Sequence, residues 1–311
     1  MAPVAKSSLP VTVIGGYLGS GKTTLVNHLL RSANGLRIAV LVNEFGELPI
    51  DADLIEAQDE NIISIAGGCV CCSYGNDLML AMIDLAQITP PPEHVLVEAS
   101  GVAIPSAIAS SIGLLTRYSL DGVVVLADGE TLRALAHDRY MGGTVRSQLK
   151  DADLLILNKV DLVRPSKLSA TRLWLSNESA HAKIIGARHA NVPPEVVLGL
   201  ARSDQSLQQS ASLHHGDLFT SISFSFDRPI DVALIAKRLA GDELGVVRAK
   251  GFATALDGTP HEIQIVGRRW TATAIPTAPY SGIVCIGSKD QLQTGPLSTL
   301  VEQSCPLSPS P

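Results

Sequence analysis

Short aliphatic runs alternate with longer amphipathic segments over roughly the first 200 residues. The runs lack a polar residue at every second position, which is typical of strands buried on both faces of a parallel sheet. Helices are predicted between the runs, for example at residues 23–31, 77–87 and 144–150. This alternation indicates right-handed crossovers and a parallel sheet that binds ligands at the carboxyl ends of its strands. Strands are predicted at residues 11–14, 38–42, 62–65, 94–97, 122–126, 154–157 and 183–185.

The pattern changes after residues 203–217, which are polar and poor in branched aliphatic side chains, as linkers and surface loops are. The elements predicted beyond this segment are a strand at 219–226, a helix at 229–239, and strands at 245–255, 261–266 and 282–286. We therefore predict an α/β domain over residues 1–202, a linker over 203–217 and a smaller α+β domain over 218–311.

Composition narrows the class of protein further. With 46% hydrophobic and 17% charged residues, the chain can form an aliphatic core in each domain and is not expected to be disordered. The net charge of −6, without clustered Lys and Arg, gives no reason to expect a nucleic-acid partner. No apolar run approaches the ~20 residues that span a bilayer, and residues 1–10 do not resemble a signal peptide. We expect a cytoplasmic protein without a membrane partner, as a monomer or weak homo-oligomer.

A glycine-rich segment follows the first predicted strand and precedes the first predicted helix. It reads GYLGSGKT and matches the pattern G-x-x-x-x-G-K-[ST]. Glycines allow a tight turn whose N–H groups point at phosphate oxygens, and the helix N-terminus adds partial positive charge. In such a P-loop, Lys22 reaches the β- and γ-phosphates and the Thr23 hydroxyl ligates Mg²⁺. The predicted phosphate-binding residues are Gly16, Gly19, Ser20, Gly21, Lys22, Thr23 and Thr24.

A base-reading segment, Asn158-Lys159-Val160-Asp161, follows the strand at 154–157. The Asp161 carboxylate suits guanine, because it can accept hydrogen bonds from both the ring N–H and the exocyclic amine. Adenine lacks this donor pair and would leave the carboxylate unpaired, which argues against an ATP-dependent enzyme such as a kinase. Asn158 would brace the loop or meet the acceptor edge of the base, and the Lys159 stem would cover the ring. The predicted nucleotides are GTP and GDP.

A carboxylate, Glu98, ends the strand at 94–97, and Gly101 follows three residues later. Many P-loop enzymes place Asp at this position to hold Mg²⁺ or its water, and use the glycine N–H to contact the γ-phosphate. The longer Glu98 side chain would contact the metal through water or orient the attacking water. The simpler alternative is a solvated acid at a strand end. The predicted catalytic residues are Lys22, Thr23, Glu98 and Gly101.

Three of the five cysteines, Cys69, Cys71 and Cys72, lie within four positions after the strand at 62–65. In a reducing compartment this crowding favours metal or redox chemistry over a structural disulfide. Thiolates are soft ligands that favour Zn²⁺ and Cu(I). The alternatives are a redox pair or small buried thiols. Because no closed four-cysteine set is present locally, a bound metal is expected to be exchangeable.

Further ligands for this metal site are sought among nearby polar residues. Glu44 and Glu47 follow the strand at 38–42, and His214 and His215 are more distant candidates. Mixed sulfur and oxygen ligands are compatible with Zn²⁺, Co²⁺, Fe²⁺ or Ni²⁺. The predicted metal ligands are Cys69, Cys71, Cys72 and Glu47, with Thr23 for Mg²⁺. Cys285, in an apolar strand, is expected to be a core residue.

Together these segments resemble the CobW-type GTPases, which are metal-handling P-loop proteins related to cobalamin-synthesis and nitrile-hydratase-activation proteins. The resemblance rests on GGYLGSGKTTLVNHLL, VNEFGELPID, GGCVCC, VLVEASGVA, LDGVVVLAD and ADLLILNKVDLV, and more weakly on HHGDLFTSISFSF, VRAKGF and SGIVCIG. It implies a P-loop NTPase domain with a mostly parallel sheet followed by a smaller α+β domain. It also implies a cytosolic GTPase that binds Zn²⁺ or a related ion through the cysteine motif and couples GTP state to metal transfer into a client protein.

Two departures from the family pattern bear on the metal site. Val42 stands where many family members have a glutamate, so one oxygen ligand proposed for some relatives is missing here. The histidine-rich stretch of some members is reduced to His214 and His215. The leading hypothesis is a slow, GTP-hydrolysing metallochaperone. The alternatives are a metal-binding regulatory or storage module with structural nucleotide, and a redox sensor that gates hydrolysis.

Overall fold

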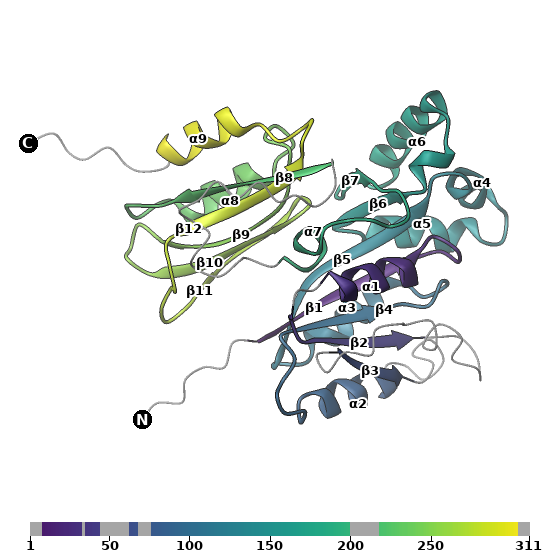
Figure 1. The fold of residues 1–311 in the computed structure, drawn as a ribbon, viewed down its shortest axis with the longest axis horizontal. Coiled ribbons are helices and arrows are strands. Elements are labelled where there is room, and N and C mark those ends of the chain that lie inside the picture. Colours follow the sequence, from purple (N-terminus) through teal and green to yellow (C-terminus); the bar gives the residue numbers. More distant parts are fainter. Residues whose placement is uncertain (1–7, 33–34, 44–61, 68–75, 200–217, 304–311) are drawn as a thin grey trace, which may run out of the picture. The chain divides into compact units, whose positions relative to one another are not determined.

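The computed structural model describes residues 8–32, 35–43, 62–67, 76–199 and 218–303 (Figure 1). The chain divides into two compact units, Met1–Val192 and Pro193–Pro311. The predicted linker, residues 203–217, lies outside the described residues. Among the residues that are described, no helix is long and apolar enough to cross a membrane.

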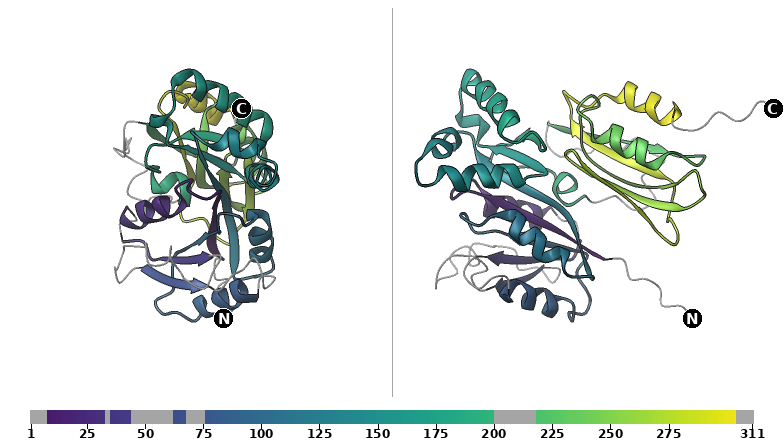
Figure 2. Two further views of the ribbon diagram at one scale, coloured as in Figure 1. Left: turned by 90° about the vertical axis from the view of Figure 1, so that its right-hand side faces the viewer. Right: turned by 180° about the vertical axis from the view of Figure 1, so that it is seen from behind.

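The described part of the first unit contains a seven-stranded sheet with the order β3-β2-β4-β1-β5-β6-β7 (Figures 1 and 2). Every neighbouring pair in it is parallel, which confirms the predicted α/β class. Its strands are β1 (Leu9–Gly16), β2 (Ile38–Asn43), β3 (Ile62–Gly67), β4 (His94–Glu98), β5 (Tyr118–Asp128), β6 (Leu154–Asn158) and β7 (Lys183–Gly186). Each predicted strand of this domain is therefore confirmed.

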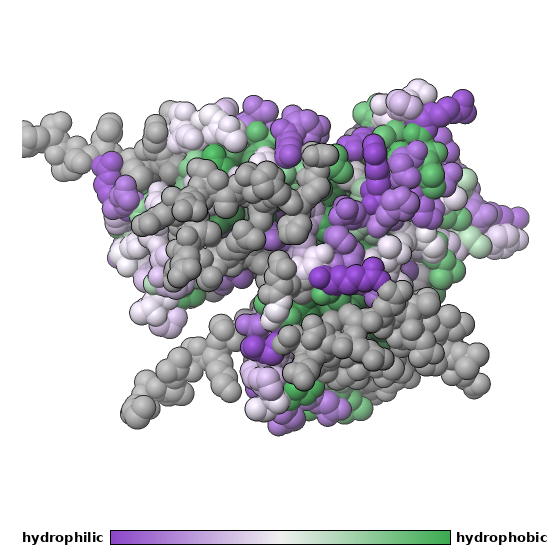
Figure 3. All heavy atoms as spheres, in the orientation of Figure 1, coloured by the Kyte–Doolittle hydropathy of each residue, from purple (hydrophilic) through white to green (hydrophobic). Residues whose placement is uncertain are grey.

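Helices cover this sheet. The helices are α1 (Lys22–Arg31), α2 (Asn76–Leu85), α3 (Pro105–Gly113), α4 (Leu132–His137), α5 (Gly142–Asp151) and α6 (Pro165–Glu178), with a 3₁₀ turn η2 (Val160–Leu162) after β6. Helices α2, α3, α4, α5 and α6 share one buried apolar cluster with alternate residues of the strands, including Val11 and Val13 of β1. Helix α1 packs against β1 and β4 through buried residues such as Leu25 and Leu29. The exposed residues of α6 are mostly polar, and hydrophilic and hydrophobic residues are interspersed over the surface in that region (Figure 3).

Strand β5 begins earlier than predicted, at Tyr118. The reason is a buried polar network that the pattern of apolar residues does not reveal. The Thr12 hydroxyl donates to Asp121 Oδ2 (3.2 Å) and lies 2.8 Å from His94 Nε2. All three side chains are at most 3% exposed. Mutual hydrogen bonding allows Asp121 to lie inside the sheet, where an unpartnered carboxylate would be costly.

The second unit begins with α7 (Pro194–Leu198) and contains an antiparallel sheet with the order β11-β10-β9-β12-β8. The strands are β8 (Phe219–Ser225), β9 (Val246–Thr254), β10 (Pro260–Val266), β11 (Arg269–Ala274) and β12 (Gly282–Ser288). Helices α8 (Val232–Ala240) and α9 (Thr294–Gln303) lie on the same side of this sheet and share its apolar core (Figures 1 and 2). This confirms the predicted α+β class.

Three elements of the second unit were not predicted from the sequence, and one begins later than predicted. Strand β11 is an edge strand with mostly exposed residues, so it lacks an apolar alternation. Helices α7 and α9 were not predicted either. Helix α8 begins at Val232 rather than at residue 229, because Asp231 accepts a hydrogen bond from the Leu234 N–H (2.9 Å) and caps the helix.

Candidate functional site

The phosphate loop connects β1 to α1 with three glycines in the left-handed region. Their φ angles are 136° at Gly16, 73° at Gly19 and 103° at Gly21, where other residues would be strained. A Cβ at Gly16 would lie 2.4 Å from Leu126 O, and one at Gly21 would lie 2.5 Å from Asn158 Nδ2. Glycine is thus required by conformation at all three positions and by close packing at two. The loop has the backbone shape that phosphate binding needs.

Helix α1 presents an open N-terminus to this loop. Within the described residues, no side chain caps the helix end and the first turn carries no acidic group. The first N–H groups and the helix dipole therefore favour an anion at this point. Lys22 is mostly buried (8% exposed), Ser20 is buried, and Thr24 is exposed on the first turn.

Thr23 and Glu98 meet beside the phosphate loop. Strand β4 pairs with β1 so that Ile14 lies opposite Glu98, which brings the end of β4 to the base of the loop. The Thr23 hydroxyl donates to Glu98 Oε1 at 2.9 Å, and Glu98 is only 2% exposed. A hydroxyl and a carboxylate are the hard oxygen donors that Mg²⁺ prefers. The residues present therefore fit a magnesium ion held at the phosphate loop.

Asn158 joins two loops that are distant in the sequence. Its Nδ2 donates to the Ser20 carbonyl of the phosphate loop (2.9 Å), and its Oδ1 accepts from the Ala190 N–H (2.8 Å). The residue is 2% exposed. Of the two roles considered for Asn158 from the sequence, this geometry corresponds to bracing the loop.

Lys159 and Asp161 follow Asn158 at the end of β6. Lys159 adopts a left-handed conformation (φ 60°), and its Nζ lies 2.8 Å from Asp128 Oδ2. Asp128 ends β5 and pairs with Asn158, so the sheet itself brings this carboxylate to the base-reading segment. The ion pair holds the Lys159 stem in one direction. Asp161 lies in η2 and is exposed, where it can accept hydrogen bonds from a base.

A further loop belongs to this edge of the sheet and was missed from the sequence. It follows β7, and His189 and Ala190 adopt consecutive left-handed conformations (φ 52° and 53°). The loop is tied to the base-reading segment by Ala187 N to Leu157 O (2.9 Å) and Val160 N to Ala187 O (3.2 Å). It contains no glycine to mark the turn. The predicted strand at 183–185 was the available signal, because residues after each strand of a parallel sheet share one edge.

Gly101 lies against the phosphate loop. A Cβ there would lie 2.4 Å from Leu18 Cδ2 and 3.0 Å from Leu18 N, so only glycine fits without movement. The backbone after β4 thus passes directly beside the glycine-rich phosphate loop. This placement is suited to sensing the terminal phosphate of a nucleotide.

The predicted metal ligands Cys69, Cys71, Cys72 and Glu47 lie outside the described residues, as do Glu44, His214 and His215. The strand ends that precede two of these segments are described: Asn43 pairs with Gly67, and Val42 pairs with Glu98. The segments carrying Glu47 and the cysteines therefore follow neighbouring parallel strands, β2 and β3. Both strands end at the same edge of the sheet as β4, which ends at Glu98. Within the described residues, no three His, Cys, Asp or Glu side chains cluster as metal ligands would.

Cys285 is fully buried in β12, which confirms its interpretation as a core residue. Burial raises the pKa of the Cys285 thiol to about 12. The thiol therefore stays protonated at neutral pH, whereas a metal ligand must be a thiolate.

Comparison with known proteins gives two family matches. The family described as "CobW/HypB/UreG, nucleotide-binding domain" matches residues 10–186, and the "Cobalamin synthesis protein cobW C-terminal domain" matches residues 219–297. A relative named zinc chaperone CobW, from Sinorhizobium sp, is 30% identical over 308 residues, covering 85% of this chain and 87% of the relative.

A second relative and one solved structure are also similar to this chain. The zinc-regulated GTPase metalloprotein activator 1 of Dictyostelium discoideum is 30% identical over 301 residues, covering 79% of this chain and 62% of the relative. The crystal structure of Zn(II)-bound YjiA GTPase from E. coli is 22% identical, covers 96% of this chain and 99% of that chain, and has a TM-score of 0.46.

Proposed function

The chain belongs to the CobW/HypB/UreG family of nucleotide-binding proteins, and from this premise we propose that it is a GTP-hydrolysing metallochaperone. In this proposal, the nucleotide state controls the release of Zn²⁺, or of a related divalent ion, to a client metalloprotein. Relatives named as zinc chaperones and as a zinc-regulated metalloprotein activator support a metal cargo and a protein client.

One observation carries the nucleotide part of the proposal: the Asn158 side chain connects the phosphate loop to the loop after β7. In this proposal, the two loops and the base-reading segment bind one nucleotide at the carboxyl edge of the sheet. The N–H groups of the phosphate loop would bind its phosphates, and Asp161 would bind its base. Asp161 favours guanine over adenine because only guanine offers it two donors.

In the proposed hydrolysis of GTP, each of these residues has its own role. Lys22 and the N–H groups of the phosphate loop bind the β- and γ-phosphates, and Thr23 with Glu98 would hold Mg²⁺. When bound, Mg²⁺ supplies positive charge that stabilises charge developing on the phosphate oxygens. Glu98 also orients water through its carboxylate, and the Gly101 N–H contacts the γ-phosphate. None of these groups is a strong base, so we expect slow hydrolysis.

The metal cargo would be bound by Cys69, Cys71, Cys72 and Glu47. Strand β3 lies three positions from β1 in the sheet, so at ~4.8 Å per strand its end is about 14 Å from the phosphate loop. We propose that coupling passes through the segments that follow β2 and β3, with a difference in metal affinity of about 1–3 kcal/mol between nucleotide states.

Competition for Zn²⁺ with a chelating dye tests this coupling. We expect the apparent Zn²⁺ affinity to differ between the protein loaded with a GTP analogue and the protein loaded with GDP. Serine replacement of Cys69, Cys71 and Cys72 should abolish high-affinity binding, whereas Cys285→Ser, at a buried thiol, should leave it intact in folded protein. Equal affinities in the two states would remove the switch. Binding of GTP without metal-stimulated hydrolysis would favour a regulatory or storage module.

A further inference from the structure

A buried glutamine on α5 holds the loop that follows β4. Gln148 is 1% exposed, and its Nε2 donates to the Gly101 carbonyl (3.1 Å) and to the Ala103 carbonyl (2.8 Å). Both hydrogens of the amide group are thus used on one short segment, 45 and 47 residues away in the sequence. No local sequence signal links these positions.

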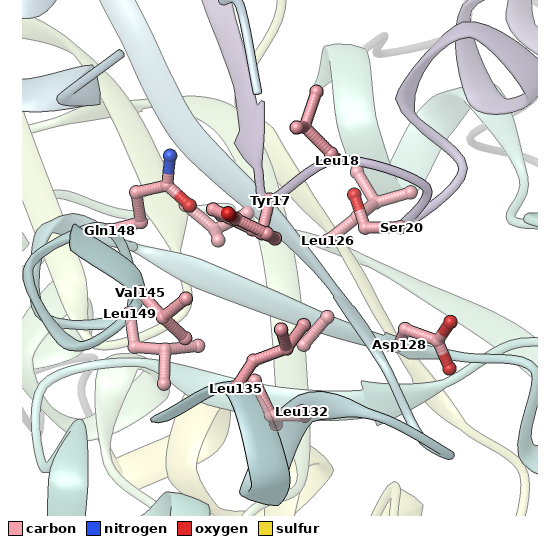
Figure 4. Close-up of a pocket in the computed structure, with 12 residues that line it drawn as sticks. Tyr17, Leu18, Ser20, Leu126, Asp128, Leu132, Leu135, Val145, Gln148 and Leu149 are labelled. Atoms are coloured by element: carbon pink, nitrogen blue, oxygen red, sulfur yellow. The ribbon is translucent and has the colours of Figure 1, made fainter. Parts of the chain in front are cut away.

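The surroundings of Gln148 keep its side chain in this position. It lines a pocket with the apolar side chains of Leu132, Val145 and Leu149, and lies beside Tyr17 of the phosphate loop (Figure 4). The pocket leaves a cavity of about 10 Å³, which is room for about one water molecule. An amide among apolar side chains is favourable only if it is hydrogen-bonded, so the two carbonyl contacts account for a polar residue here.

Other hydrogen bonds hold the two ends of the loop that follows β4, and one of them comes from α5. The loop is anchored at its start by Ala99 N to Ile14 O (2.9 Å). At its other end, α3 begins with Pro105 and has no side-chain cap from its own N-cap residue. Asp151, at the end of α5, accepts from the Ser106 N–H (2.9 Å) in that first turn. Helix α5 therefore holds both the loop and the start of the following helix.

We propose that Gln148 is a positioning residue for nucleotide sensing. By holding the carbonyls of Gly101 and Ala103, it sets the direction of the Gly101 backbone beside Leu18, and hence the fit of this loop to a γ-phosphate. This inference rests on the proposed function, because it assigns Gln148 to the GTPase site described above. Without Gln148, the phosphate loop still binds the phosphates shared by GTP and GDP, but the loop after β4 no longer distinguishes them.

Gln148→Met is the main test, because methionine keeps an unbranched side chain and removes both donors. Leu149→Met is the matched control: it is the next residue of the same helix, is 2% exposed and lines the same pocket, but makes no side-chain hydrogen bond. We expect Gln148→Met to lower kcat for GTP hydrolysis about 10-fold, equivalent to about 1.4 kcal/mol. Its affinity for GDP should stay within about twofold of wild type, while its preference for a GTP analogue over GDP is lost.

Gln148→Glu gives a second readout that a packing role would not produce. An ionised carboxylate opposes two carbonyl oxygens, whereas the protonated acid donates one hydrogen bond. Burial and the carbonyls favour the protonated form, so the ratio of variant to wild-type kcat should rise as pH is lowered. This readout also applies if Gln148→Met does not fold.

The outcomes separate the inference from the proposed function. If wild-type protein neither binds nor hydrolyses GTP, the proposed function is wrong and the inference falls with it. If wild-type protein turns over and Gln148→Met matches it in kcat and in nucleotide preference, only the inference is overturned. Equal losses in Gln148→Met and Leu149→Met, or a pH-independent Gln148→Glu ratio, would likewise reduce Gln148 to a packing residue.

Discussion

Removal of the Asn158 side chain should lower the free energy of unfolding of the protein even without nucleotide, because this side chain connects two loops at the carboxyl edge of the sheet. Asn158→Ala leaves the Ser20 carbonyl and the Ala190 N–H without the partners that they have at 2.9 Å and 2.8 Å. Each buried polar group that loses its partner costs roughly 1–3 kcal/mol. Because water can fill part of the space that the amide leaves, we expect the lower part of that range for each group, about 2–4 kcal/mol in total.

Asn191→Ala is the matched control for this measurement. Asn191 is the same residue type in the same loop, but its side chain is exposed, so its truncation should change stability by less than about 0.5 kcal/mol. Urea unfolding without nucleotide gives the free-energy difference between the two variants. Native-state hydrogen exchange localises it, because the Ala190 amide should exchange faster in Asn158→Ala and not in Asn191→Ala.

Nucleotide binding gives an independent check on the same reasoning. In the proposed function, Asn158 orients loops that contact the shared parts of GTP and GDP, so Asn158→Ala should weaken the binding of both nucleotides by a similar factor, about 10-fold or more. That pattern differs from the state-specific effect expected of Gln148→Met. If Asn158→Ala and Asn191→Ala have the same stability and the same Ala190 exchange rate, the bridge contributes nothing and the reasoning is refuted.

Three further predictions concern single residues. Asp161→Asn should shift preference from guanine toward xanthine nucleotides, because an amide can donate where the carboxylate accepts; an unchanged preference in competition binding would contradict base reading there. Gly16→Ala should destabilise the protein by more than about 1 kcal/mol, because φ is 136° and the new Cβ would meet Leu126 O. The control Gly143→Ala lies in helix α5 with open space around it, so it should be neutral or stabilising. Equal shifts in melting temperature for the two variants would contradict this reasoning. Burial raises the pKa of Cys285 to about 12, so its thiol should resist alkylation until the protein unfolds. The contribution of this raised pKa to stability is complete below the ordinary thiol pKa and should fall as pH rises toward 12. Rapid labelling of the native protein that is abolished by Cys285→Ala would refute this.

Much of the first unit could be predicted because its signals are local. A buried parallel strand is a run of aliphatic residues, and the phosphate loop is a run of glycines ending in Lys22 and Thr23. Both can be recognised within about ten residues of sequence. The exposed edge strand β11 and the early start of β5 were missed for the opposite reason. Polar residues such as Ser119 and Asp121 in β5, and Arg269 and Thr271 in β11, interrupt the apolar pattern, and the strand conformation is explained by partners elsewhere in the chain.

The parallel α/β class and the phosphate loop could be predicted from the sequence alone, and guanine reading at Asp161 could be proposed from it, because each depends on residue type and spacing within one segment. The groups that hold those segments together became visible only in the folded structure. Asn158 reaches Ser20 across 138 positions, Lys159 pairs with Asp128, and Gln148 supports the loop at Gly101. Contacts at such separations follow from strand order and helix packing, which bring together strand ends that are far apart along the chain.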